Sequence, residues 1–232
     1  MINCINKYKI YHEALNTTED ILKITENWNK YNNFIKNNNK KIFTSQSKFE
    51  SSIIEESIYR IFKKFEDDII KVGSIKTYLN MYYSANNFND FKNHGVFKYN
   101  IKDMDFAIYK EVKLRIGNCN KEKTINIPII AIECKTYIDK TMLESSVATA
   151  EKIKNGNPYC KFYIVTGTYE VNKDIDMIIS THIDQIYILK KDNKNNDIDK
   201  DVVQKLYEDV ENYLNSIWND IDNNIKNHGI LI

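Results

Sequence analysis

A nearly continuous apolar run at residues 127–134 (IPIIAIEC) constrains the fold more than any other segment of this chain. A strand that is covered on both faces is apolar at almost every position, as in the centre of a sheet between layers of helices. After this run, residues 139–155 repeat apolar side chains at helical spacing, and residues 161–166 (KFYIVT) form a second apolar segment. A helix between two buried strands predicts a parallel, right-handed crossover. We therefore expect an α/β protein.

The remaining segments extend this sheet on both sides. Residues 74–84 and 105–116 are rich in β-branched and aromatic side chains, which is typical of strands. The short polar stretch 117–123 predicts an antiparallel hairpin between the second of these strands and the apolar run. Further elements are predicted as helices at 17–36, 47–67 and 201–225 and as a strand at 185–190. The expected product is a mixed central sheet flanked by helices, with extra N- and C-terminal helices.

The chain lacks the composition of a linker between domains. It has only 6 Gly and 2 Pro among 232 residues and contains no Gly- or Ser-rich stretch. We expect one domain over residues 1–232, made of an N-terminal helical segment (1–44), a core (45–190) and a C-terminal helix (198–226).

Bulk composition excludes several classes of protein but does not identify a partner. No apolar run approaches the roughly 20 residues needed to span a bilayer, and the N-terminus lacks the apolar core of a signal peptide, so we expect a cytoplasmic protein. The 4 cysteines are scattered and the 4 histidines lack metal-ligand spacing, so free thiols and no zinc site are expected. The net charge of +1, from 33 basic and 32 acidic residues, neither favours nor excludes nucleic-acid binding.

Two charged residues stand at the end of the most hydrophobic strand. Glu133 and Lys135 are two positions apart, so they project from the same face of a strand. Such groups are costly to bury without partners. A solvated ion pair at the end of the strand is one explanation, because this triplet pattern is common by itself.

An upstream carboxylate favours a catalytic explanation. Asp105 begins the predicted strand 105–116, so the hairpin would bring it near Glu133. Two carboxylates there can hold Mg²⁺, which prefers oxygen ligands and retains several waters. Lys135 would then hydrogen-bond the attacking water or the scissile phosphate and offset developing negative charge. These are the parts that phosphodiester hydrolysis requires.

Glu50 is a further candidate in the helix predicted at 47–67. It is spaced four, eight and eleven residues before Ile54, Ile58 and Ile61, which places it on the inward stripe, whereas Glu55 and Glu56 are expected to point elsewhere. A supporting role at the site is one explanation. The other is the ordinary preference for acidic residues at a helix N-terminus.

Three segments carry a resemblance to type II restriction endonucleases of the PD-(D/E)XK superfamily. They are residues 49–56 (FESSIIEE), 105–108 (DFAI) and 132–142 (IECKTYIDKTM). Within the superfamily they resemble the family that cuts at sites with a CTNAG core, over roughly residues 45–170, although Met104 stands where the idealised motif has proline. The resemblance implies a PD-(D/E)XK nuclease fold with residues 45–190 as catalytic core, Mg²⁺-dependent cleavage of double-stranded DNA, and a cognate DNA methyltransferase as functional partner. It makes Asp105 and Glu133 metal ligands, Lys135 the catalytic lysine and Glu50 a supporting carboxylate.

Two other functions remain compatible with these residues. One is a structure-specific nuclease of repair or recombination with the same fold, and the other is a catalytically inert DNA-binding protein. The absence of a helicase-like or zinc-bearing segment favours restriction over repair, and the joint presence of the three site residues argues against an inert protein.

Secondary features fit DNA cleavage but have simpler explanations. The polar residues 136–141 could place helix N-terminal amides near a phosphate, or merely cap the helix. Asn- and Lys-rich stretches at 32–41 and 86–100, expected as loops, could reach bases and phosphates, or reflect composition bias.

A nearly symmetric DNA site has two equivalent strands, so we expect a homodimer on DNA. The final helix offers an apolar seam with heptad-like spacing, at Val203, Tyr207, Val210, Leu214, Ile217 and Ile221. Alternatively this helix packs on its own domain, since Val202, Leu206, Tyr213 and Trp218 widen its apolar face.

Overall fold

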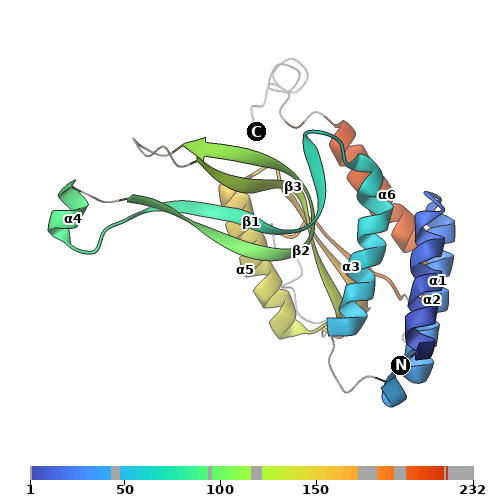
Figure 1. Ribbon diagram of the computed structural model, residues 1–232. Helices are drawn as coiled ribbons and strands as arrows, with labels where there is room; N and C mark the ends of the chain where they lie inside the picture. The colour runs from blue at the N-terminus through green and yellow to red at the C-terminus, as the bar shows by residue number, and fades with distance from the viewer. Residues whose placement is uncertain are drawn as a thin grey trace, which may run out of the picture.

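The protein is described by a computed structural model that covers residues 2–42, 48–93, 96–115, 122–171, 182–190, 197–216 and 218. Within these ranges the side chains of residues 2–4, 36, 38–42 and 48–50 are not described. The described strands form one mixed sheet in the order β1-β2-β3-β4-β5 (Figure 1). They are β1 (Ile70–Ser84), β2 (Val96–Arg115), β3 (Glu122–Ile138), β4 (Lys161–Tyr169) and β5 (Gln185–Ile188). The first two pairings are antiparallel and the last two are parallel.

Helices cover both faces of the sheet (Figure 1). The described helices are α1 (Ile2–Asn16), α2 (Ile21–Ile42), α3 (Lys48–Phe62), the short 3₁₀ turn η1 (Lys63–Phe65), α4 (Phe88–Asn93), α5 (Lys140–Gly156) and α6 (Lys200–Asn215). On one face α5 buries Leu143, Ala150 and Ile153 against the sheet. On the other face α3 packs on β2 and β3, with α1, α2 and α6 behind or beside it. The predicted α/β architecture is confirmed.

The crossover that follows the apolar run also has the predicted form. Residues 127–134 are the centre of β3, where Ile130, Ala131 and Ile132 are fully buried. The chain leaves β3, passes through α5 and returns in β4, which pairs with β3 in parallel. Asp139 caps α5 by accepting a hydrogen bond from the Met142 N–H at 2.8 Å, so capping explains this one of the polar residues at the helix start.

Several boundaries differ from the sequence-based prediction. Strand β2 begins at Val96, not at Asp105, so Asp105 lies inside the strand instead of opening it. Residues 32–41 belong to α2, and 86–100 contains α4 and the start of β2, so neither stretch is a simple loop. Most of the polar turn 117–123 lies outside the described residues, but the pairing of Arg115 with Glu122 confirms the antiparallel hairpin.

The outer halves of β1 and β2 form an arm that projects away from the helices and carries α4 at its tip (Figure 1). In this arm β1 and β2 pair from Asn80 with Asn100 to Ser84 with Val96. Most of its side chains are exposed on both faces. A ribbon without a covered face lacks the alternation of apolar and polar residues that marks a half-buried strand, so the prediction missed its extent.

Helix α6 packs on its own domain. Val203, Tyr207 and Val210 of the proposed seam are buried in the same core as α2 and α3, together with Leu206. The seam is therefore not available for pairing with a second copy, and the intramolecular explanation is confirmed for the described residues. Ile217 and Ile221 lie outside them.

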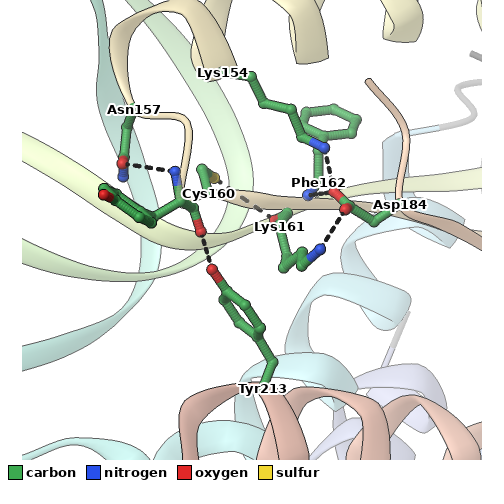
Figure 2. Close-up of polar contacts among 8 residues, drawn as sticks. Lys154, Asn157, Cys160, Lys161, Phe162, Asp184 and Tyr213 are labelled. Carbon is green, nitrogen blue, oxygen red and sulfur yellow. Dashed lines mark hydrogen bonds and ion pairs between the residues drawn. The ribbon is translucent and has the colours of Figure 1, made fainter. Parts of the chain in front are cut away.

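A carboxylate clip fixes the beginning of β4 (Figure 2). Asp184 pairs with Lys154 of α5 at 2.7 Å and with Lys161 at 2.9 Å. It also accepts a hydrogen bond from the Phe162 backbone N–H at 2.8 Å. The clip ties the end of the crossover helix to the strand that pairs with β3.

Among the described residues, no helix is long and apolar enough to cross a membrane. Cys134 and Cys160 are free and buried, as predicted, whereas Cys119 and the side chain of Cys4 lie outside the described part.

Candidate active site

A β-bulge sets the position of Asp105. Along β1 and β2 the register moves from Gly73 paired with Ala107 to Ile75 paired with Met104, so β2 holds one extra residue at this point. A bulge bends its strand and re-aims the side chains within it. Opposite the bulge, Gly73 has a φ of 138°, a backbone conformation that L side chains rarely adopt. Glycine thus permits the irregular pairing that presents Asp105.

The Asp105 carboxylate faces strand β3. Its Oδ2 accepts a hydrogen bond from the Cys134 backbone N–H at 2.8 Å. Burial raises the pKa of Asp105 above its usual value; the Cys134 N–H and the charges of Lys135 and Lys102 oppose this rise, and the Glu133 charge adds to it. Asp105 and Glu133 therefore form a pair of carboxylates that repel one another in a partly buried place.

Glu133 and Lys135 form an ion pair of 2.7 Å on β3, with 17% and 31% of their side chains exposed. Burial would lower the pKa of Lys135, but the hydrogen bond and charge of Glu133, helped by Asp105, outweigh it and raise the pKa. The ammonium therefore remains protonated at neutral pH. Because the pair is largely buried and β3 continues to Ile138, it is not the solvated pair at a strand terminus that the simpler explanation required.

The second carboxylate oxygen of Glu133 is the unusual atom of this site. Oε2 is buried and has no hydrogen-bond partner among the described residues. A buried polar atom without a partner costs about 1–3 kcal/mol or more when charged, so such an atom calls for an explanation. An absent ligand that binds this oxygen would supply one.

The donor set fits a hard divalent cation. Asp105 and Glu133 offer carboxylate oxygens from neighbouring strands, and Mg²⁺ is held by one or two carboxylates plus waters and phosphate oxygens. No group of three or more His, Cys, Asp and Glu side chains suited to a metal occurs in the described part of the chain.

Helix α3 brings an acidic residue that the sequence-based prediction placed wrongly. Glu55 was expected to point away, yet its charge helps raise the pKa of the Cys134 thiol, after burial and Asp105, so it lies near β3. The signal was available, because Glu55 precedes the fully buried Ile58 and Phe62 by three and seven residues. Glu50 lies in the first turn of α3, but its side chain is outside the described part of the structure.

Strand β4 approaches β3 very closely beside the site. A Cβ placed on Gly167 would lie 2.3 Å from the Thr136 carbonyl oxygen, a distance no side chain can accept. Lys135 pairs with Thr166 one position away. Glycine at 167 thus allows the backbone contact that fixes β3 directly after the lysine.

Comparisons with known proteins agree with this fold. Residues 46–196, about two thirds of the chain, match the family described as Bpu10I restriction endonuclease. A solved structure described as "native BbvCI A2B2 tetramer at low resolution" is similar, with a TM-score of 0.72 and 20% identity over 96% of this chain and 88% of that chain. No protein in the curated set matches. The structural likeness, at this identity, shows a shared fold.

Proposed function

The chain belongs to the Bpu10I restriction endonuclease family and is a site-specific deoxyribonuclease, and we propose that it hydrolyses double-stranded DNA with Mg²⁺, Asp105, Glu133 and Lys135. The observation that carries this proposal is the buried Oε2 of Glu133, which has no hydrogen-bond partner in the described part of the chain and lies next to Asp105 and a protonated lysine. Two carboxylates and one cation at a partly buried place match the needs of phosphodiester hydrolysis.

Each residue has a distinct role in this proposal. Asp105 and Glu133 would hold Mg²⁺, which when bound supplies charge to the phosphate and an acidified water. The Cys134 N–H orients Asp105 through the 2.8 Å hydrogen bond. Lys135, protonated because of Glu133, would donate a hydrogen bond to the attacking water or to the scissile phosphate. Glu50 would support the site from α3.

Incubation of the protein with plasmid DNA and Mg²⁺ tests the proposal. A site-specific endonuclease gives discrete bands that EDTA prevents. A smear or nicking would favour the structure-specific repair or recombination nuclease, and intact plasmid that is nonetheless bound would favour the catalytically inert DNA-binding protein. Run-off sequencing of the products would give the recognition site. Neither the matching family nor the similar structure specifies a recognition sequence for this chain, so the CTNAG core stays a prediction.

Double-strand cleavage requires two active sites, or one site used twice. We propose that two copies act together on DNA as a homodimer, through a surface other than the buried seam of α6. The similar solved structure is described as an A2B2 tetramer, so it contains more than one subunit. Sedimentation of the protein with a duplex, in Ca²⁺ to block chemistry, tests this state; a monomer that breaks both strands in one encounter would refute it.

The same function has consequences for the domain organisation of the chain, its location and its functional partner. We propose a single endonuclease domain over residues 1–232, with 1–44, 45–190 and 198–226 as its helical segment, catalytic core and final helix. A restriction enzyme acting in the cytoplasm needs protection of the host DNA, so a cognate methyltransferase is its expected functional partner.

A further inference from the structure

The arm formed by β1 and β2 has two different faces. Side chains alternate along a strand, and residues paired across two strands share a face. Met104 and Ala131 belong to the same core cluster, on the α5 side of the sheet. Because side chains two positions apart on a strand share a face, Glu133 and Lys135 lie on the same side as Ala131. By the same rule Lys102 lies on the same side as Met104.

The same alternation continues outward along β2 and across to β1. We call the resulting set the arm's site-side face, and its exposed members are Asn80, Tyr82, Val96, Lys98, Asn100 and Lys102. The pairings of Asn80 with Asn100 and of Tyr82 with Lys98 keep the set on one face past the register shift in β1. The arm thus extends the sheet face that bears the active site.

Charge distinguishes this face from the rest of the chain. It holds two lysines and no acidic residue, whereas the whole chain is almost balanced, with 33 basic and 32 acidic residues. Lys98 and Lys102 form no ion pair with another described residue. An exposed row of lysine, asparagine and tyrosine offers donors to phosphate oxygens, and a polyanion is its complement.

The face is continuous with the catalytic residues. Lys102 lies three residues before Asp105 on β2, on the side of the sheet that carries Glu133 and Lys135. From Lys102 to Val96 the strand covers about 20 Å, at roughly 3.3 Å per residue. That length corresponds to about six base pairs of duplex DNA, at roughly 3.4 Å per step.

Aromatic side chains on the opposite face of the arm contact helix α4 at its tip. Tyr83 meets Phe91 and Phe97 edge to face, with ring centroids 5.3 and 5.4 Å apart, and its hydroxyl donates to the Phe91 carbonyl at 2.9 Å. Asp90 of α4 accepts hydrogen bonds from the Asn86 backbone and side-chain amides. These contacts tie α4 to both strands and hold the arm in one shape.

We propose that the site-side face of the β1–β2 arm binds the phosphate backbone of duplex DNA beside the cleavage site, over about six base pairs. This inference rests on the proposed function, since it assigns the arm to the same substrate. It makes Lys98 and Lys102 positioning residues that set where the duplex lies relative to Asp105.

The test is the salt dependence of binding to a labelled 30-base-pair duplex in Ca²⁺. Each phosphate contact contributes a slope of about −0.9 to log affinity against log salt, so Lys98→Ala/Lys102→Ala should flatten the slope by about 1.8. Between about 50 and about 200 mM salt the affinity of the double variant should then fall about 12-fold less than that of wild type. Shortening the duplex until it no longer reaches the arm should bring the two proteins to the same affinity.

The matched control is Lys76→Ala/Lys123→Ala, which removes two exposed lysines from the other side of the sheet, one on β1 and one on β3. Lys76 alternates with the buried Ile75 and Thr77, and Lys123 lies over the Tyr99 ring at 5.2 Å. Its slope should equal that of wild type. Equal slopes for all three proteins would overturn the inference, while plasmid cleavage by wild type would still uphold the proposed function.

Two other results separate the hypotheses. A flattened slope in the arm variant, with no cleavage by wild type, would support the arm and refute the proposed function. An unchanged slope accompanied by loss of self-association in sedimentation would overturn the inference, because the arm would then bind a second protein chain.

Discussion

Replacing Asp184 with asparagine should destabilise the protein strongly, because it removes the charge at the centre of a mostly buried clip (Figure 2). The Asp184 and Lys154 side chains are only 15% and 17% exposed and lie 2.7 Å apart. Breaking a buried pair by removing one partner costs about 3–5 kcal/mol, since it leaves the other charge unpaired. Lys161 is 37% exposed, so its share is at most about 1 kcal/mol. Asparagine keeps an oxygen for the Phe162 N–H, so that hydrogen bond is retained.

We therefore expect Asp184→Asn to lower the free energy of unfolding by about 4 kcal/mol. For a chain of this size that corresponds to a fall in Tm of roughly 8–16 °C. Urea denaturation followed by far-UV circular dichroism measures the first quantity, and a thermal scan measures the second. The expected cause is the stranded Lys154 ammonium, so Asp184→Asn/Lys154→Met should recover at least half of the loss.

An exposed ion pair provides the matched control. Lys140 and Glu144 lie 3.9 Å apart with 57% and 51% of their side chains exposed, so Glu144→Gln should change stability by less than about 0.5 kcal/mol. The reasoning is refuted if Asp184→Asn also stays within about 0.5 kcal/mol of wild type, or if adding Lys154→Met lowers stability further.

The other predictions concern the active site. Lys135→Ala should abolish cleavage and leave DNA binding in Ca²⁺ largely intact, because in the proposed mechanism the lysine acts on the transition state; cleavage at near wild-type rate would contradict this. Asp105→Asn and Glu133→Gln should each lose Mg²⁺-dependent activity, and a Mg²⁺ titration matching wild type would remove that residue from the ligand set. The raised pKa of Asp105 favours its protonated form in the folded protein, so metal-free stability should fall as the pH rises through this pKa, and the fall should be smaller in Asp105→Asn. Glu50→Gln should reduce cleavage less than either ligand substitution, and a rate equal to wild type would leave Glu50 only the helix-terminus explanation.

The central sheet could be predicted because its physical signals are local. A strand covered on both faces must be apolar throughout, so residues 127–134 identified β3 without knowledge of its neighbours. Alternation placed Glu133 and Lys135 on one face, and the hairpin brought Asp105 to them; the ion pair and the Cys134 hydrogen bond are consistent with that geometry. The catalytic roles themselves remain predictions.

What escaped prediction depends on contacts between distant residues. The bulge at Asp105 arises from the register of two strands, and a single strand's sequence does not specify it. The position of Glu55 could have been predicted only if Phe62 had been included in the buried stripe of α3. Packing of α6 against its own domain was decided by the neighbouring α2 and α3, because an apolar stripe alone does not say which surface will cover it.

The close contact at Gly167 has a consequence for how this protein tolerates mutation. In a library of single substitutions, position 167 should score among the least permissive, although its residue has no functional group to lose. Any added Cβ must push the Thr136 carbonyl away, and with it the segment that directly follows Lys135. A survey of inactive variants would thus include alleles with Asp105, Glu133 and Lys135 all intact. The proposed active site would therefore also depend on Gly167, a residue that contributes only by having no side chain.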